Sequence, residues 1–457
     1  QIVDIKKMKF NKIRFFVILL FFNSCNSYNE YKKNINNYND PNLFHDSMQK
    51  LTDIIVYDIF SPPVASRIYV YPSIAAYEVL LNDYPEYNSF SDQLNGLSSI
   101  PKPNPDKEYS FPLASIHAFL TVGKDLIFSK DKMTEFQKNL FNDLKSKGMP
   151  KDIYKRSIQY GDQVANHIKD WYSNDNYKET RSYPKFTVQR NREDTWKPTP
   201  PDYMDGIEPH WNKIRTLAID SSNQFITAPP PKFNLDKNSK FFKDLYEVYE
   251  IGNNLTEEQT NVANFWDCNP YVSNHIGHAM FATKKITPGG HWIGITQIAS
   301  KKAELNLMES IYAYSLVSIG LFDSFIVCWD EKYRSILVRP ETLINQYIDE
   351  DWIPVLQTPP FPEYTSGHSV ISRSAANILT FILGDNFNFL DTTEEIYGLP
   401  ARNYDSFLQA SDEAAISRLW GGIHYMPAIT NGIDQGDRVG KFIIKNLDVK
   451  NNIISKN

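Results

Sequence analysis

The sequence predicts an all-α protein with a helix-bundle architecture, in which two bundles are fused in one compact unit. Apolar residues recur every three or four positions over most of the chain, as on one face of a helix, and alternating strand-like runs are nearly absent. The 457 residues exceed the usual size of one hydrophobic core. A long, irregular, proline-rich stretch at 174–235 interrupts the helical pattern. We therefore expect an N-terminal half at 43–235, which includes this stretch, and a C-terminal half at 236–450.

The individual helices follow from the apolar spacing. In the N-terminal half the pattern predicts helices at 45–60, 68–82, 110–129, 133–148 and 150–173. In the C-terminal half it predicts helices at 238–252, from Thr256 onward, and at 301–339, 366–384, 404–420 and 427–446. Thr256 is followed by two glutamates, which is typical of a capped helix start.

The stretch at 174–235 is expected to pack on the surface as a long irregular excursion. Prolines cluster in it at 197–203 and 228–233. Its Trp196, Trp211 and Phe225 are large apolar side chains that need a surface to bury against. We therefore interpret it as part of the fold and not as a linker between independent domains.

The first 25 residues are typical of a signal peptide with a lipobox-like end. Basic residues precede an apolar run of eight at 15–22, which is too short to span a bilayer, and Cys25 follows a small residue. A bacterial lipoprotein with a lipid on Cys25 is the favoured interpretation, and a plain signal peptide is the alternative. Residues 26–42 are rich in Asn, Tyr and Lys and are expected to form a polar tether. On this interpretation the protein is exported and faces the periplasm or the exterior. It contacts a membrane only through its lipidated N-terminus, because no later apolar run is expected to be long enough to span a bilayer.

Composition excludes several classes of function. The net charge of -6 offers no basic surface for a nucleic-acid backbone. Three cysteines cannot form a disulfide framework, and the absence of a C-x-x-C spacing argues against a thiolate zinc site.

The first of three segments that suggest chemistry contains Lys332 and Arg339. On one helix their spacing of seven places both on the same face, about 10 Å apart along the axis. Pro340 disfavours helix at the preceding residue, so we expect Arg339 to end the helix. Two cations that face the same way can grip an anion, although two solvated surface cations are the alternative.

The second segment is a proline-rich approach to Ser366, Gly367 and His368. Ser366 is a helix N-cap type, and a helix is predicted to follow it and to stop at Gly384. A helix N-terminus presents free N–H groups to an anion, and a histidine in its first turn can act as an acid or base. An ordinary capped helix with an exposed histidine is the alternative.

The third segment contains Arg418 and His424, which on one straight helix would point to nearly opposite faces. Gly421 and Gly422 between them can break the helix, and Pro427 suits the start of the next one. A broken helix can aim both side chains at one point. A locally paired arginine with a buried neutral histidine is the alternative.

Together these blocks resemble the signature of the vanadium-dependent haloperoxidases and the type 2 phosphatidic acid phosphatases. The signature has three blocks. The first is Lys, six residues and Arg-Pro; the second is Ser-Gly-His; the third is Ser-Arg, a short glycine-containing spacer and His. All three blocks occur in this sequence in the same order. The length of the chain is similar to that of the haloperoxidase branch. The resemblance implies that Lys332, Arg339, Ser366, Gly367 and Arg418 hold the oxygens of vanadate or phosphate.

The resemblance also implies the roles of the remaining site residues. His424 is the ligand to vanadium, or the nucleophile toward phosphorus, and His368 is the acid or base. In the haloperoxidase reading Lys332 polarises the bound peroxide. Phe361 and Trp329 occupy positions that form the halide-side wall in chloroperoxidase-like members. The alternative is that both residues only pack in the core.

This sequence departs from the family pattern at the position four residues after the last histidine. Many members have Asp there, whereas this chain has Ala428, so the partner that orients His424 is not identified. Neither Asp434 nor Asp323 is an assured replacement. A second histidine group, His275, His278 and His291, is interpreted as a pocket rim or as structural rather than as a metal cluster.

Three functions remain as hypotheses. The first is a vanadium-dependent haloperoxidase that binds vanadate and oxidises a halide with hydrogen peroxide. The second is a phosphatase that uses the same pocket without a cofactor, cleaving a phosphomonoester through a phosphohistidine. The third is a non-catalytic surface lipoprotein that binds glycans through its aromatic residues, which make up 14% of the chain.

Overall fold

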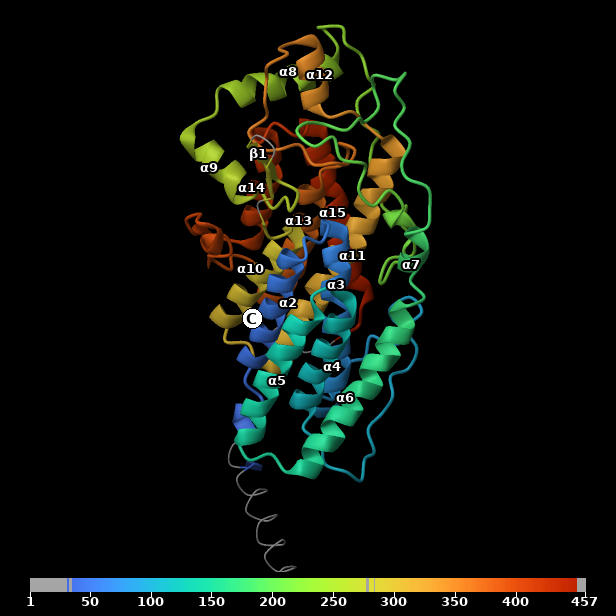
Figure 1. Cartoon of the computed structure of the whole chain (residues 1–457), viewed down its shortest axis with the longest axis vertical. Coiled ribbons are helices and arrows are strands. Elements are labelled where there is room, and N and C mark those ends of the chain that lie inside the picture. The colour runs from blue at the N-terminus through green and yellow to red at the C-terminus, as the bar shows by residue number, and fades with distance from the viewer. Residues whose placement is uncertain (1–30, 33–34, 277–278, 283, 450–457) are drawn as a thin grey trace, which may run out of the picture.

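The protein is an elongated, all-α molecule in which two helical bundles lie end to end (Figure 1). The computed structural model describes residues 31–32, 35–276, 279–282 and 284–449. The predicted all-α, helix-bundle architecture is confirmed.

The N-terminal bundle is formed by α2 to α6. Their bounds are Asn42–Tyr57, Pro62–Leu80, Phe111–Leu126, Lys130–Ser146 and Lys151–Tyr172, so every helix predicted in this half is present. Ser61 caps α3, because its side chain accepts a hydrogen bond from the Val64 N–H, and Pro62 and Pro63 fill the first turn where no N–H is needed. Every residue of α3 is buried, which makes it the core helix of this bundle.

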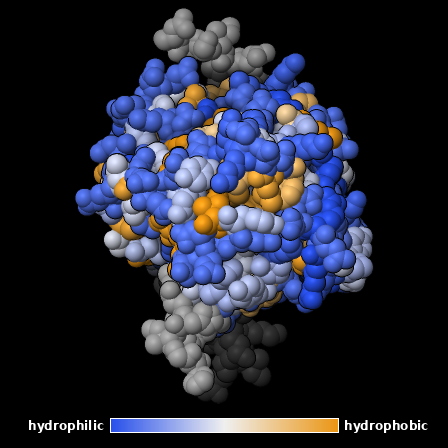
Figure 2. All heavy atoms as spheres, turned by 90° about the horizontal axis from the view of Figure 1, so that it is seen from above, coloured by the Kyte–Doolittle hydropathy of each residue, from blue (hydrophilic) through white to orange (hydrophobic). Residues whose placement is uncertain are grey.

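The C-terminal bundle is formed by α10 (Pro288–Lys302), α11 (Leu307–Ser335), α13 (Gly367–Leu383), α14 (Phe407–Trp420) and α15 (Met426–Asn446). Three shorter helices, α8 (Lys240–Asn253), α9 (Glu257–Phe265) and α12 (Pro340–Tyr347), lie at the end of the molecule away from the N-terminal bundle (Figure 1). Seen from that end, the surface is mostly hydrophilic, with apolar side chains gathered in one small area (Figure 2). The predicted capping at Thr256 is confirmed as a capping box with Gln259.

Helix α11 joins the two bundles, because it packs on α3 of the first and on α13 of the second. It is long and apolar enough to cross a membrane, contrary to the expectation that no later run would qualify. The most apolar part of α11 is wholly buried in this fold, however, and a core helix can be as long and as apolar as a membrane span. No continuous apolar run marks α11 in the sequence, because polar residues are scattered along it.

Strands are a minor part of the described chain. β1 (Ser273–Ile276) pairs antiparallel with β2 (Ala279–Ala282), and β3 (Phe389–Asp391) pairs antiparallel with β4 (Arg402–Tyr404). In the second hairpin Phe389 pairs with Tyr404 and Asp391 pairs with Arg402. Asp391 also contacts His291, so the end of β3 lies at the start of α10.

The excursion at 174–235 contains only the one-turn helix α7 (Tyr177–Thr180) and the 3-10 turn η3 (Trp211–Lys213). As predicted, it is packed on the fold: Trp196 and Trp211 are fully buried, and Phe225 is buried as well. Asp323 of α11 holds it in place, because its carboxylate accepts hydrogen bonds from the backbone N–H groups of residues 217–219. Asp323 therefore fixes the excursion and does not support the oxyanion site.

Two details of the N-terminal and C-terminal predictions were wrong. Part of the expected polar tether packs on the bundle instead: Tyr38 is buried, and its hydroxyl donates to the carbonyl of Leu144 in α5. Helix 301–339 ends early, at Ser335, because Ile336 adopts a left-handed conformation with φ 46°. The predicted signal peptide and Cys25 lie outside the described residues.

Candidate active site

The turn after α11 places Lys332 and Arg339, although not on one helix face as the spacing suggested. Beyond Ile336 the chain is extended and pairs with the excursion, since the Trp196 N–H donates to the Ile336 carbonyl and the Val338 N–H donates to the Asp194 carbonyl. Arg339 then stands at the start of α12, next to Pro340. A backbone turn, and not helical periodicity, brings the two cations to one place.

Lys332 is fully buried at the last turn of α11. Its ammonium donates to the carbonyl oxygens of Pro362 (3.0 Å) and Glu363 (3.1 Å), and also to that of Thr365. Burial lowers the pKa of Lys332 to about 8, and Arg339 acts in the same direction. The lysine therefore anchors the segment before α13 while carrying a positive charge at neutral pH.

Arg339 is fully buried and only partly satisfied. Its Nε donates to the Phe361 carbonyl (3.0 Å) and its Nη1 to the Ile423 carbonyl (2.7 Å), and Nη1 lies 3.2 Å from Nε2 of His424. Its Nη2 has no hydrogen-bond partner among the described residues. Burying a guanidinium N–H without an acceptor costs free energy. The unpaired Nη2 therefore indicates that an anion binds here.

Glu363 is the residue that orients His424, and the sequence analysis missed it. His424 Nδ1 lies 2.9 Å from Glu363 Oε1, which also accepts the Tyr425 N–H at 2.9 Å. A carboxylate acceptor places the proton on Nδ1 and leaves the lone pair on Nε2. Burial, and then Arg339, lowers the pKa of His424 well below its usual value, so the ring is neutral and can donate that lone pair.

Neither Ala428 nor Asp434 takes part in this orientation. Ala428 contributes only its carbonyl oxygen, which accepts the Ser366 N–H, and Asp434 pairs with Arg438 on the surface. The sequence offers only one signal for this partner, the presence of a carboxylate in the proline-rich approach just before Ser366; its burial and its contact with His424 are seen only in the structure.

Helix α13 begins as predicted with Ser366 as its N-cap, whose side chain accepts from the Ser369 N–H, and it ends before Gly384. A Cβ added at Gly367 would have Trp329 as its nearest neighbour, at 3.8 Å, so the helix start opens toward that ring. His368 is half-buried in the first turn, and its Nε2 has no partner within the described ranges. Burial, and then Arg418, lowers the pKa of His368 well below its usual value.

Arg418 and His424 meet because the helix between them is broken, as predicted. α14 ends at Trp420, Gly422 adopts φ 75°, and α15 starts beyond with Pro427 in its first turn. Arg418 is buried, and its Nη2 donates to the Ala263 carbonyl at 3.3 Å. The nearby Asp267 balances part of its charge.

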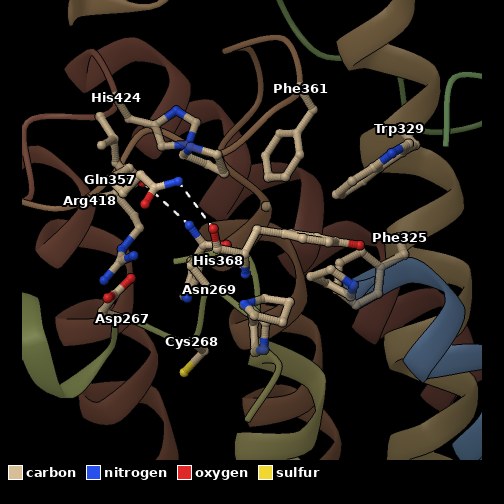
Figure 3. Close-up of a pocket in the computed structure, with 17 residues that line it drawn as sticks. Asp267, Cys268, Asn269, Phe325, Trp329, Gln357, Phe361, His368, Arg418 and His424 are labelled. Carbon is tan, nitrogen blue, oxygen red and sulfur yellow. Dashed lines mark hydrogen bonds between the residues drawn. The ribbon is translucent and has the colours of Figure 1, made fainter. Parts of the chain in front are cut away.

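Some of these side chains line a cavity of about 40 Å³, shown in Figure 3, which has room for roughly three water molecules. Lys332, Arg339, Glu363 and Ser366 are not among the residues that line it. His368, Arg418 and His424 line one side of it. Opposite them the rings of Trp329 and Phe361 lie with their centroids 5.0 Å apart. Lys332 and Arg339 stand behind the Phe361 ring, 5.0 Å and 5.1 Å from its centroid. The cavity is therefore polar and cationic on one side and aromatic on the other.

The structure thus brings the three predicted blocks together around one small space. Glu363 and the cavity wall at 267–271, which includes Asp267, were not predicted from the sequence. Of the second histidine group, only the side chain of His291 is described, since His278 is outside the described residues and nothing is described of the His275 side chain. His291 is fully buried next to Cys268, which lines the cavity, and is not itself part of the lining.

Comparison with known proteins identifies the family. A solved structure of the first bacterial vanadium-dependent iodoperoxidase is 48% identical, with a TM-score of 0.87, over 91% of this chain and 99% of that chain. The chain belongs to the vanadium-dependent haloperoxidase family. The family model for the second helical-bundle domain of VCPO matches residues 313–451, which contain all three blocks.

Two further solved structures share this haloperoxidase fold. They are apo-type and holo-type bacterial vanadium-dependent chloroperoxidases, 15% and 16% identical, with TM-scores of 0.63 and 0.61. Each match covers 85% of this chain, and 95% and 93% of the respective relative. Comparison with curated proteins found no match. As a member of the family, the chain is an enzyme of the vanadate haloperoxidase type, which argues against the non-catalytic glycan-binding hypothesis.

The residues of this haloperoxidase fit a bound vanadate. The unpartnered Nη2 of Arg339 is a donor, and Nε2 of His424 carries the lone pair of the ring, which would exchange its contact with Arg339 Nη1 for a metal bond. Lys332, Arg339 and Arg418 carry three positive charges, and they are opposed by Glu363, when that carboxyl is ionised, and by Asp267 beside Arg418, so positive charge is left for an oxyanion. The ammonium of Lys332 already contacts three carbonyl oxygens. It can bind the oxyanion only if an oxyanion oxygen replaces one of them.

Proposed function

We propose that this enzyme oxidises a halide with hydrogen peroxide at a vanadate held in the cavity between His424 and the aromatic wall. The observation that carries the proposal is the unpartnered Nη2 of Arg339, whose Nη1 lies 3.2 Å from the His424 nitrogen that would bond the metal. Bound vanadate supplies a Lewis acid that activates peroxide toward a halide without a change in the oxidation state of vanadium. The net reaction converts hydrogen peroxide, halide and a proton into hypohalous acid and water.

The protein's own groups hold and balance the oxyanion. His424 provides the metal ligand through Nε2, while Glu363 fixes its ring from the other nitrogen. Arg339, Arg418 and Lys332 neutralise the oxygens, and Ser366 with the Gly367 N–H adds donors at the start of α13. Burial of all three cations strengthens these interactions, because little water screens them.

His368 handles protons in this proposal. Without an anion, burial and Arg418 keep its ring neutral, so its Nε2 is available as a base. A bound oxyanion offsets the effect of Arg418 and raises the pKa of His368. The residue then takes a proton when peroxide binds and returns it to the oxygen that leaves as water.

Iodide is the proposed halide. The 48% identical relative is described as an iodoperoxidase. The wall of Trp329 and Phe361 removes water from an anion that binds against it. The cost of removing water from an anion falls as the ion becomes larger, so this wall favours the largest common halide.

The deciding experiment measures iodide, bromide and chloride oxidation by the purified chain with hydrogen peroxide, before and after loading with vanadate. Vanadate-dependent iodide oxidation that is lost in His424→Ala, and kept in the control His167→Ala on α6, supports the proposal. The same preparations are assayed with p-nitrophenyl phosphate. Phosphate release that vanadate inhibits, with no halide oxidation, replaces the proposal with the phosphatase that shares this pocket.

We also propose that the protein is exported and anchored by a lipid on Cys25. The support is the basic start, the apolar run and the small residue before this cysteine. In a bacterial host the full chain is expected in the membrane fraction, with label from a radioactive fatty acid, whereas Cys25→Ser is expected to lose the label. A labelled Cys25→Ser chain, or an unlabelled parent chain, contradicts the proposal.

A further inference from the structure

A second cluster of chemically active side chains lies beside the cavity and has no part in the proposed reaction. It consists of Cys268 after α9, His291 in the first turn of α10, and Glu394 in the loop between β3 and β4. All three are buried, with at most 3% of their surface exposed. Ligand-type side chains from three separate segments thus meet in the interior of the protein.

The three ligand-type atoms form a compact triangle. Cys268 Sγ lies 3.4 Å from His291 Nδ1 and 3.8 Å from Glu394 Oε1, and the latter two atoms are 3.1 Å apart. In a tetrahedral zinc site, with Zn–S about 2.3 Å and Zn–N or Zn–O about 2.0 Å, neighbouring ligand atoms lie roughly 3.3–3.6 Å apart. The triangle therefore has the dimensions of one face of a zinc tetrahedron.

Asp391 prepares His291 for this role. His291 Nε2 lies 2.8 Å from Asp391 Oδ2, while Asp391 Oδ1 accepts from the N–H and the hydroxyl of Thr393. A carboxylate at Nε2 keeps a proton there, so Nδ1 is the nitrogen that faces Cys268 and Glu394. Zinc would take the place of the proton that Nδ1 shares with Glu394, as in a carboxylate–histidine–zinc arrangement. The Trp266 ring stacks on the imidazole, 4.4 Å between centroids at 17°, and holds its plane.

We propose that Cys268, His291 and Glu394 bind one zinc ion, which leaves one coordination position for a water molecule or another small ligand. No C-x-x-C spacing marks this site in the sequence, because its ligands come from positions more than twenty residues apart. A single soft thiolate with a histidine and a carboxylate suits zinc better than calcium or magnesium, which prefer all-oxygen sites.

The zinc ion would fix one wall of the catalytic cavity. Cys268 lies between Asp267, which balances Arg418, and Asn269, and all three line the cavity (Figure 3). A metal bound to Cys268 would tie this segment to α10 and to the β3–β4 loop. The site therefore has a structural role beside the oxyanion pocket, and its occupancy does not depend on vanadate.

The test uses the full chain purified without vanadate, stripped with a chelator and titrated with Co²⁺ in place of zinc. We expect one equivalent to bind with a thiolate-to-cobalt charge-transfer band, and zinc to abolish the band by displacing cobalt. The band is expected to be absent in Cys268→Ser and weakened in Glu394→Gln. Cys328→Ser is the matched control, since Cys328 is an equally buried thiol outside the cluster.

Metal analysis provides the second measurement. After incubation with zinc and gel filtration, the parent and Cys328→Ser are expected to retain one zinc per chain, and Cys268→Ser none. The proposal is overturned if the parent binds only sub-stoichiometric zinc and shows no cobalt band, or if the band survives in Cys268→Ser. If Cys268→Ser does not fold, the parent titration decides alone. None of these readouts requires peroxidase activity, so they stand apart from the test of the proposed function.

Discussion

At the residue scale, the site depends on a carboxylate that is itself fully buried. Glu363 contacts His424 and the Tyr425 N–H, and burial raises the pKa of Glu363 to about 7 although Arg339 lowers it. Glu363 lies five residues before His368, in the proline-rich approach to α13, and from there it reaches the imidazole of a residue 61 positions later.

Replacing Glu363 is expected to weaken vanadate binding through His424. Glu363→Ala leaves the His424 Nδ1–H without an acceptor and is expected to raise the dissociation constant of vanadate by about 10–100-fold. Glu363→Gln keeps an oxygen acceptor and is expected to lose less. The measurement is a vanadate titration of each apoprotein followed by calorimetry.

The control for Glu363 is Glu78→Gln, a buried glutamate of α3 that accepts from Ser89 and the Phe90 N–H far from the cavity. It is expected to change stability without changing vanadate affinity. Equal affinity losses in Glu78→Gln and Glu363→Gln would show that Glu363 acts only through general stability.

The lowered pKa of Lys332 predicts how the affinity for vanadate depends on pH. Burial lowers the pKa of Lys332 to about 8, so the free enzyme loses this charge as the pH rises through about 8. An oxyanion binds the protonated form better, so affinity is expected to fall above pH 8, by up to about tenfold per pH unit. Calorimetric titrations of the parent and of Lys332→Met over the same pH range separate the lysine from changes in vanadate itself. An identical alkaline slope in both proteins would exclude Lys332 as the cause.

At the element scale, α13 carries Ser366 and His368 into the cavity, and its position depends on close packing against α15. A Cβ added at Gly436 of α15 would lie 2.1 Å from the Val370 carbonyl oxygen of α13. No L side chain fits at that distance without moving a helix. The glycines of α15 therefore set the distance between the two helices.

Gly436→Ala is expected to destabilise the protein by about 1–3 kcal/mol, because the added methyl group pushes α13 away from α15. The free energy of unfolding in denaturant measures this effect. Gly289→Ala in α10 is the control, since its Cβ would have no neighbour closer than 3.6 Å. It is expected to change stability by less than about 1 kcal/mol. A Gly436→Ala protein as stable as the parent would contradict the packing argument.

Prediction from the sequence succeeded for elements with strong local signals. The cap at Ser366, the stop at Gly384 and the break at Gly421 and Gly422 were all predicted, because each depends on a few neighbouring residues. The end of α11 was not predicted, because no glycine or proline marks Ile336. Its left-handed turn is stabilised by pairing with residues 194–196, which are distant in the sequence. Glu363 was missed for the same reason, since its partner His424 is 61 residues away.

At the scale of the whole molecule, the excursion at 174–235 connects the surface to the site. The carbonyl of Ile207 accepts hydrogen bonds from Trp329 Nε1 (3.2 Å) and the Tyr333 hydroxyl (2.6 Å). Residues 217–219 of the same segment are held by Asp323 in the middle of α11. The irregular segment therefore helps to hold the aromatic wall of the cavity.

Asp323→Ala is expected to release part of the excursion, because three backbone N–H groups lose their acceptor. The loss in stability is expected to be about 3 kcal/mol or more. Limited proteolysis is expected to cut the variant near residues 217–219 under conditions in which the parent stays intact. The control Asp220→Ala changes an exposed residue next to this segment and is expected to resist cleavage like the parent. An Asp323→Ala chain with parental resistance would contradict this role.

The three carbonyls that Lys332 contacts have a consequence for how the enzyme matures. The ammonium holds the backbone of segment 362–365 through contacts within the protein, so this part of the site does not need the oxyanion in order to fold. Acquisition of the ion then requires an exchange of partners around Lys332 Nζ and His424 Nε2, with no folding step. Stored apoprotein should accordingly become competent upon simple mixing, even long after synthesis, without an assisting factor.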